Sequence, residues 1–141
     1  MTPLYIESSA ILAWLFGEPM ANKVIVEMNK ADQKLTSVIT LIEVERVITR
    51  AEKGALLKAS ECQKLRGIFS TFKNQMLLME LSEEVRKRAQ EAFPIEPIRT
   101  LDAIHLATAL TFIMAYPELS ILSFDKRIIE NAKSLGLGVG S

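Results

Sequence analysis

Four carboxylates stand at the boundaries of predicted secondary-structure elements, and they are the side chains of this chain best suited to act together: Glu7, Glu43, Asp102 and Asp125. Carboxylate oxygens are hard ligands that favour Mg²⁺ or Mn²⁺ over zinc. Acids that lie close together raise one another's pKa values unless they share a cation. A divalent cation held in this way can activate water and neutralise charge on a phosphodiester. The residue types therefore predict a Mg²⁺ or Mn²⁺ site with hydrolytic chemistry.

Each of the four acids also has a purely structural interpretation. Asp125 is a good helix N-cap, and Asp102 suits the dipole of the helix in whose first turn it lies. Glu43 follows Thr40 by three residues, which is the spacing of a capping box if a helix begins there. Glu7 fits a structural role least well, because a carboxylate between a buried strand and an apolar helix is seldom without a partner. Residue spacing leaves both interpretations open.

A helix from Arg99 to Tyr116 is the element that must position the acids, and we expect Thr100 to be its N-cap. This segment is apolar on almost all sides, which a globular domain tolerates only where a helix is buried on most faces. Its first turn nevertheless carries Asp102. A carboxylate at the N-terminus of such a helix either interacts favourably with the helix dipole or faces a cleft that holds an ion.

Short apolar runs alternate with helical patterns along the whole chain. This alternation predicts parallel pairing and an α/β fold, a three-layer α/β/α sandwich with a central, mainly parallel sheet of four to five strands. Without a linker or repeat, residues 1–141 are expected to form a single domain. The predicted strands are 3–6, 34–37, 75–81 and 119–124, with an edge strand or a frayed end at 138–141; the predicted helices are 10–16, one beginning at 18, 38–53, 57–72, 83–92, 99–116 and 126–135.

Parallel strands all end on one side of a sheet, and ligands bind there. Glu7 ends the first predicted strand, and Asp125 follows the fourth, with Ser8 or Ser9 expected to cap the helix after Glu7. Asp102 lies on the rim of the same side, and Glu43 lies one to two turns into the helix after the second strand. We therefore expect the four carboxylates to meet in one pocket.

Composition sets limits on the class of protein. Lys plus Arg and Asp plus Glu both number 17, so the chain of 141 residues carries no net charge and is not expected to grip nucleic acid over its whole surface. Cys62 is the only cysteine, which favours a reducing compartment. The sequence shows neither the pattern of a signal peptide nor an apolar run that spans a bilayer. We expect a soluble cytoplasmic protein with no membrane contact.

The sequence segments around the four acids resemble those of PIN-domain nucleases, and they occur in the same order and in the same kinds of secondary-structure element. The segments that carry the resemblance are Tyr5–Ala10 (YIESSA), Ser37–Val44 (SVITLIEV), Leu101–Ala107 (LDAIHLA) and Leu122–Asp125 (LSFD). The resemblance covers nearly the whole chain, and the length is typical of the VapC-type toxins of toxin–antitoxin pairs. No single segment is specific, but the four in sequence are strong evidence together.

The resemblance implies a Mg²⁺- or Mn²⁺-dependent endoribonuclease that acts on RNA. It implies that the four acids form the metal site, with the hydroxyls of Ser9 and Ser123 beside it. It also implies a cognate antitoxin protein that docks in a helical groove, and a homodimer. Trp14 and Phe16 belong either to the core or to an apolar patch for such a partner.

Glu7 departs from the family pattern, which has Asp at the end of the first strand. The longer side chain moves the carboxylate outward by about 1.5 Å, and Mg²⁺ tolerates little change in geometry. The substitution is compatible with a working variant, a weakened enzyme or a change that silences a toxic protein. The alternative function is therefore a catalytically weak PIN-like module that binds antitoxin or RNA. A phosphatase with an Asp nucleophile is disfavoured, because the first-strand acid is Glu.

Basic residues near the acids have two interpretations each. Arg46 and Arg50 share one helix face and either pair with the neighbouring Glu45 and Glu52 or guide RNA phosphates to the metal. Arg99 is the better single candidate for a phosphate contact.

His105 lies one turn after Asp102. It acts either as a general base or, as we favour, as a hydrogen-bonded histidine within the helix packing.

Overall fold

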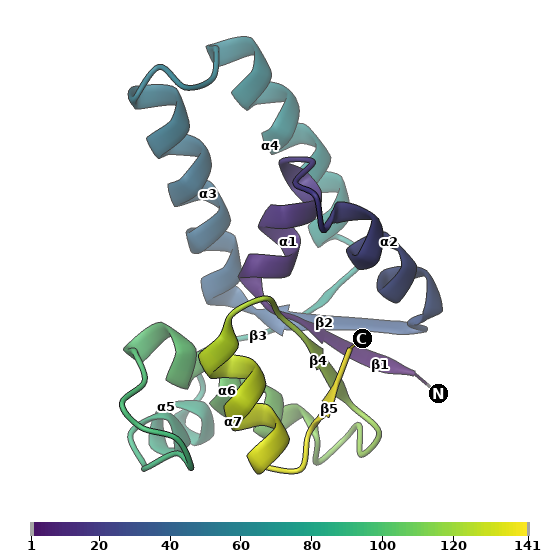
Figure 1. Ribbon diagram of the computed structural model, residues 1–141, viewed down its shortest axis with the longest axis vertical. Coiled ribbons are helices and arrows are strands. Elements are labelled where there is room, and N and C mark those ends of the chain that lie inside the picture. Colours follow the sequence, from purple (N-terminus) through teal and green to yellow (C-terminus); the bar gives the residue numbers. More distant parts are fainter. Residues whose placement is uncertain (1, 141) are drawn as a thin grey trace.

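Five short strands form one parallel sheet in the order β3–β2–β1–β4–β5 (Figure 1). The computed structural model describes residues 2–140. The strands are β1 (Pro3–Ile6), β2 (Gln33–Ser37), β3 (Leu77–Met79), β4 (Ser120–Leu122) and β5 (Gly138–Val139). The helices are α1 (Ser8–Leu15), α2 (Ala21–Lys30), α3 (Val38–Lys53), α4 (Ala59–Lys73), α5 (Glu83–Ala89), α6 (Thr100–Phe112) and α7 (Lys126–Ser134).

Helices cover both faces of the sheet. Helices α1 to α4 lie on one face and α5 to α7 on the other (Figure 1). Strand β1 shows why: successive side chains point to opposite faces, so Leu4 and Ile6 enter the core under α1 to α4, while Tyr5 enters the core under α6 and α7. The predicted three-layer α/β/α sandwich is confirmed, and its sheet is parallel throughout.

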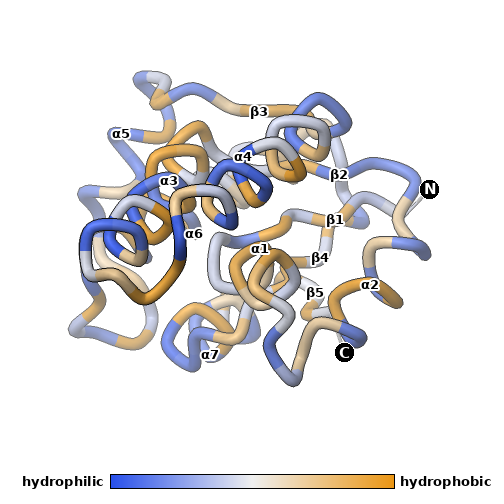
Figure 2. The backbone as a smooth tube through the Cα atoms, turned by 90° about the horizontal axis from the view of Figure 1, so that it is seen from above, coloured by the Kyte–Doolittle hydropathy of each residue, from blue (hydrophilic) through white to orange (hydrophobic). Residues whose placement is uncertain are grey.

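The hydropathy of the residues follows this layering. Figure 2 shows that most residues of α1 are hydrophobic, whereas α7 alternates between hydrophobic and hydrophilic residues. Helix α6 matches its predicted character, since most of its length is buried and only its ends reach the surface. Within residues 2–140, no helix is both long enough and apolar enough to cross a membrane.

Two predicted helix starts are wrong by one to two residues, and both errors concern a cap. Helix α1 begins at Ser8 with Glu7 as its N-cap, so neither Ser8 nor Ser9 caps it. Helix α6 has Arg99 as its N-cap, with no hydrogen bond from the side chain, so Thr100 is the first helical residue. Helix α3 begins at Val38, as predicted, and the side chain of Ser37 caps it.

The other boundaries differ only in length. Helix α6 ends at Phe112 instead of Tyr116, because the chain turns there ahead of Pro117, whose ring disfavours a helical residue before it. Strands β3 and β4 are shorter than predicted. A fifth strand exists as the edge strand β5, and Ser141 of the predicted segment lies outside the described residues.

Candidate active site

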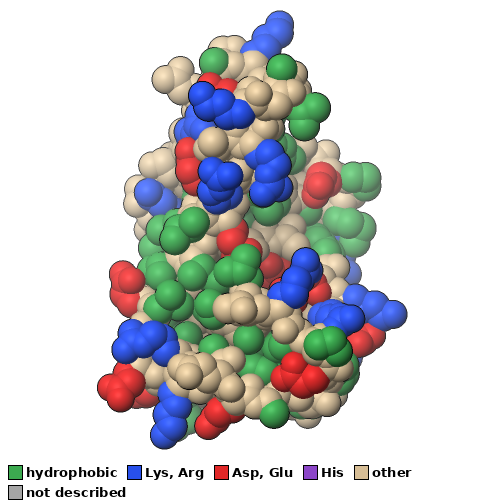
Figure 3. Space-filling view, turned by 90° about the vertical axis from the view of Figure 1, so that its left-hand side faces the viewer, with side chains coloured by type: hydrophobic (Ala, Val, Ile, Leu, Met, Phe, Trp, Pro, Cys, Tyr) green, Lys and Arg blue, Asp and Glu red, His purple; other side chains and the backbone are tan. Residues whose placement is uncertain are grey.

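The four predicted acids line one cavity of about 350 Å³. It lies at the carboxyl ends of the strands, because β1 and β4 pair in parallel and Glu7 and Asp125 follow them. Helix α3 contributes Glu43, and the first turn of α6 contributes Asp102. Figure 3 shows Asp and Glu side chains in a hollow in the middle of this side of the molecule, with Lys and Arg side chains around it. The sequence-predicted meeting of these side chains is therefore present in the fold.

Glu7 is buried, and hydrogen bonds occupy both of its carboxylate oxygens. Ser123 and Ser9 hydroxyls donate to Oε1, at 2.6 Å for Ser123. The Ser8 hydroxyl at 2.6 Å and the Ser9 amide at 3.0 Å donate to Oε2. Burial raises the pKa of Glu7, but the nearby His105 charge and the three serine hydroxyls outweigh burial and lower its pKa overall. The carboxylate therefore stays charged and firmly held.

Ser9 and Ser123 were predicted as hydroxyls beside the site, and both lie there. The Ser123 hydroxyl also accepts from the amide of Asp125 at 3.0 Å, and the Ser9 hydroxyl accepts from the amide of Phe124 at 2.9 Å. These bonds tie the start of α1 to the segment between β4 and α7. The sequence analysis did not predict that the Ser8 hydroxyl also contacts the Glu7 carboxylate.

Asp102 is the acid whose hydrogen bonding is incomplete. Its side chain is nine-tenths buried, and Oδ2 has no hydrogen-bond partner within residues 2–140. The Arg99 guanidinium approaches that oxygen only to 3.6 Å. Burial and the charge of Asp125 raise the pKa of Asp102, although Arg99 acts in the opposite direction. A buried carboxylate oxygen without a donor is costly, so this position favours a cation.

Asp125 has the N-cap role that the sequence offered, and it also lines the cavity. Its Oδ1 accepts from the amides of Arg127 at 2.9 Å and Ile128 at 3.4 Å, so it caps α7. Its Oδ2 lies 3.6 Å from the Arg99 guanidinium at the cavity. One oxygen therefore serves the helix, and the other faces the site.

Glu43 is not part of a capping box, because α3 begins two residues before Thr40. Its Oε1 lies 2.6 Å from Nε2 of His105, whose other ring nitrogen lies 2.7 Å from the Tyr5 hydroxyl. The favoured interpretation of His105 as a hydrogen-bonded histidine within the packing is confirmed, but its partner is a site acid. The sequence analysis did not identify Tyr5 as a partner of His105. The available signal was the alternation of side chains along β1, which points Tyr5 to the face covered by α6.

The residues at this cavity fit a hard divalent cation. The four acids that line the cavity have the oxygen donors that such a cation prefers, and Asp102 has a buried oxygen that lacks a hydrogen-bond donor within residues 2–140. In residues 2–140, no three Asp, Glu, His or Cys side chains already converge as a metal cage. Arg99, beside Asp102 and Asp125, provides positive charge at the rim, and its side chain is 84% exposed, so it is free to swing away.

The favoured interpretation of Arg46 and Arg50, a solvent-exposed helix face that pairs with Glu45 and Glu52, is right about exposure and wrong about the pairs. Arg66 of α4 forms the ion pairs with both acids instead, at 2.7 Å from Glu45 and 3.0 Å from Glu52. Across the described residues, Arg46 and Arg50 are exposed and form no ion pair. Their proposed contact with RNA phosphates stays a prediction.

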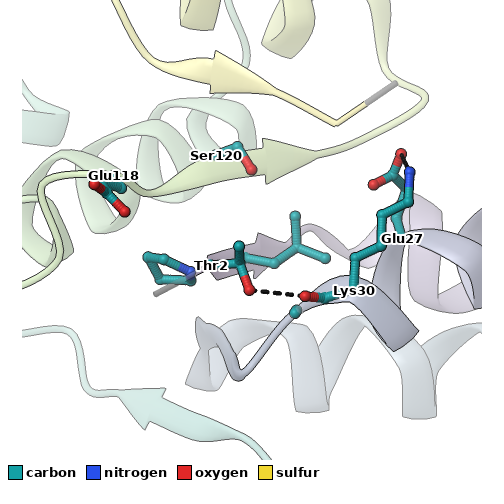
Figure 4. A pocket seen from close by; sticks show the side chains of 8 residues that line it. Thr2, Glu27, Lys30, Glu118 and Ser120 are labelled. Atoms are coloured by element: carbon teal, nitrogen blue, oxygen red, sulfur yellow. Dashed lines mark hydrogen bonds and ion pairs between the residues drawn. The ribbon is translucent and has the colours of Figure 1, made fainter.

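A second cavity lies at the amino ends of the strands (Figure 4). There the Thr2 hydroxyl donates to the carbonyl of Lys30 at 2.7 Å, and Lys30 lies 3.9 Å from Glu27. These groups fasten the start of the chain to the end of α2. The cavity lined by the four acids lies at the opposite end of the sheet.

Trp14 and Phe16 are both half-buried and pack against the core under α1 to α4. Trp14 packs against Phe72 with ring centroids 4.8 Å apart and the ring planes tilted by 48°, and both line a shallow groove with Ile68. Trp14 thus belongs to the core and also borders an apolar surface.

Two curated proteins of Mycobacterium tuberculosis are similar to this chain over nearly its full length. Ribonuclease VapC46 is 30% identical over 139 residues, which cover 99% of this chain and 97% of the relative. Ribonuclease VapC35 is 27% identical over 136 residues, which cover 96% of this chain and 94% of the relative.

Solved structures share the fold at low sequence identity. VapBC2 from Rickettsia felis, bound to a DNA fragment from its promoter, matches with a TM-score of 0.67 at 10% identity and covers 97% of this chain and 96% of its own. FitAcB from Neisseria gonorrhoeae matches with a TM-score of 0.63 at 18% identity, and the match covers 98% of this chain and 96% of the FitAcB chain.

The family model of the PIN domain matches residues 4–135, which span every element from β1 to α7 and all four acids. This match agrees with the parallel five-stranded sheet and with the resemblance of the segments around the acids. The chain belongs to the PIN-domain family.

Proposed function

We propose that this protein is a Mg²⁺- or Mn²⁺-dependent endoribonuclease and the toxin of a toxin–antitoxin pair, acting as one PIN-like domain. The observation that carries the proposal is the buried Asp102 oxygen without a donor, in a cavity lined by three further carboxylates. The ribonuclease names of the two relatives support the activity, and the toxin–antitoxin complex from Klebsiella pneumoniae, which shares the fold with a TM-score of 0.58, supports the pairing.

Each acid has a role that follows from its surroundings. Asp102 and the free oxygen of Asp125 would hold the metal first, because neither oxygen has a hydrogen-bond donor among residues 2–140. Glu43 and Glu7 would complete the set from the opposite wall. The bound cation would supply an activated water and neutralise charge on the phosphodiester. Arg99, exposed at the rim, is the residue placed to bind an RNA phosphate.

The test is RNA cleavage by the purified protein with and without Mn²⁺. We expect cleavage that requires the metal and that falls at least about 100-fold in Asp102→Asn, since that change removes a ligand charge and keeps the shape. Arg86→Gln, an exposed change on α5 away from the cavity, is the matched control and should cleave normally. Metal-independent cleavage, or full activity in Asp102→Asn, would contradict the proposal.

A second candidate function is a binding module with weak catalysis, and Glu7 favours it. Four hydrogen bonds fill the acceptor positions of its carboxylate, so a metal would have to displace one donor. The shorter side chain of Glu7→Asp cannot keep all four bonds. If the longer side chain weakens the enzyme, Glu7→Asp will bind Mn²⁺ more tightly and cleave RNA faster than wild type. Equal or lower activity would show that Glu7 is a working ligand.

The proposed partners are a cognate antitoxin and a second copy of this chain. The apolar groove beside Trp14 and Phe72 is compatible with a helix of an antitoxin. Light scattering after size-exclusion chromatography would give the oligomeric state. Co-expression with the neighbouring reading frame would show whether a small protein co-purifies and suppresses cleavage.

A further inference from the structure

A line of hydrogen bonds runs from the core of the sheet to the site. The Tyr5 hydroxyl lies 2.7 Å from Nδ1 of His105, and Nε2 of the same ring lies 2.6 Å from Oε1 of Glu43. Tyr5 and His105 are both buried, with 0% and 1% of their surface exposed. Three elements that are distant in sequence, β1, α6 and α3, are joined by these two bonds.

The chemistry of the groups fixes the direction of the bond to Glu43. A carboxylate oxygen only accepts, so Nε2 of His105 carries the proton and donates it to Glu43. The Tyr5 hydroxyl, which can donate or accept, pairs with Nδ1. Tyr5 therefore fixes the ring orientation in which His105 presents an N–H to Glu43.

Glu43 depends on this contact for its orientation. In residues 2–140 its carboxylate has no other hydrogen-bond donor, and its side chain is 21% exposed at the cavity. The same imidazole nitrogen lies 3.9 Å from Oε2 of Glu7. His105 thus stands between the two glutamates and one helical turn from Asp102, on a helix that packing holds rigid.

We propose that His105, held by Tyr5, is a positioning residue that aims Glu43 at the metal; this inference rests on the metal site of the proposed function. Groups that hydrogen-bond a ligand fix its geometry, and their loss commonly lowers metal affinity about 10- to 100-fold. His105 touches neither the metal nor the substrate in this role. Its effect passes entirely through Glu43.

The experiment measures Mn²⁺ affinity by calorimetry on the full chain, together with RNA cleavage. We expect His105→Leu to weaken Mn²⁺ binding about 10- to 100-fold and His105→Gln, whose amide can still donate, to restore it to within a few-fold of wild type. Tyr5→Phe removes the hydroxyl alone and should give a smaller loss. Circular dichroism confirms that each variant is folded.

A double-mutant cycle separates positioning from general packing. Glu43→Ala should lose affinity to a similar degree, and adding His105→Leu should cost nothing further. The matched control is Leu106→Val, which deletes a buried methylene from the same helix, lowers stability and leaves Mn²⁺ affinity unchanged.

Four results would overturn the inference, and they are distinguishable. If wild type binds Mn²⁺ and His105→Leu binds it equally well, His105 and Tyr5 have no positioning role, although the proposed function stands. If wild type does not bind Mn²⁺ at all, the proposed metal site is wrong, and the positioning role of His105 is wrong as well. Additive losses in the cycle, or failure of His105→Gln to restore binding when folded, would assign His105 to packing.

Discussion

At the scale of the residue, the proposed role of Asp102 as a metal ligand conflicts with the stability of the metal-free fold. Its buried Oδ2 lacks a donor, and burial together with Asp125 raises its pKa. An acid whose pKa is higher in the folded than in the unfolded state destabilises the fold while it is charged. That destabilisation is present at neutral pH and disappears as the pH falls through the folded-state pKa.

Replacing this charge should therefore stabilise the metal-free protein. We expect Asp102→Asn to raise the free energy of unfolding by on the order of 0.5–1 kcal/mol, or the Tm by about 2–4 °C at neutral pH, while activity is lost. The gain should shrink on acidification, because the wild-type carboxyl is then protonated. Calorimetry of both proteins in EDTA from pH 7 to pH 4 measures it. A lower Tm in the variant at pH 7 would mean that Asp102 is a structural residue.

The residue scale is also where prediction from sequence was least complete. The types and positions of the acids pointed to one cavity, because Glu7, Asp102 and Asp125 follow a strand or open a helix and Glu43 lies within the first two turns of α3. Their partners could not be predicted: Glu43 and His105 are 62 residues apart, and Tyr5 and His105 are 100 apart. Such contacts depend on side-chain packing across the sheet, which has no local signature in the chain.

At the scale of the element, Arg66 holds the helical hairpin of α3 and α4 together. It pairs with Glu45 and Glu52 across the two helices, and its Nη2 also reaches the Thr49 hydroxyl at 3.4 Å. The hydrogen bonds that Arg66 donates to both glutamates raise its pKa, so it stays charged. Helical periodicity predicted the hairpin, but neighbours in sequence suggested the wrong arginines as partners of these acids.

Removing that charge should loosen the hairpin modestly. We expect Arg66→Gln to lower the urea concentration at the midpoint of unfolding only slightly, since the groups are partly exposed and such ion pairs contribute little to stability. Urea unfolding in low salt and in 1 M NaCl tests it, because salt should reduce the difference. Arg50→Gln, a change on α3 without an ion pair among the described residues, is the control. A salt-independent loss would point to packing by the Arg66 stem instead.

At the scale of the whole molecule, the sheet order explains why distant acids meet. Strands β1 and β4 lie side by side at its centre, so the segments after them reach the same edge, where α3 and α6 also begin. Alternating strand and helix patterns predict this arrangement, because a parallel sheet leaves few other connections. Helix starts were less predictable, since Glu7 and Arg99 occupy N-cap positions for which serine and threonine are the usual choice.

The central claim is that one divalent cation is held where these elements converge. Crystals of the wild-type chain soaked in Mn²⁺, with anomalous diffraction recorded near the manganese edge, test it directly. We predict a peak in the cavity that contacts Asp102 and Asp125, with the Arg99 side chain displaced. A map without a peak in this cavity, or with manganese bound only at the amino ends of the strands beside Glu27, would contradict the account.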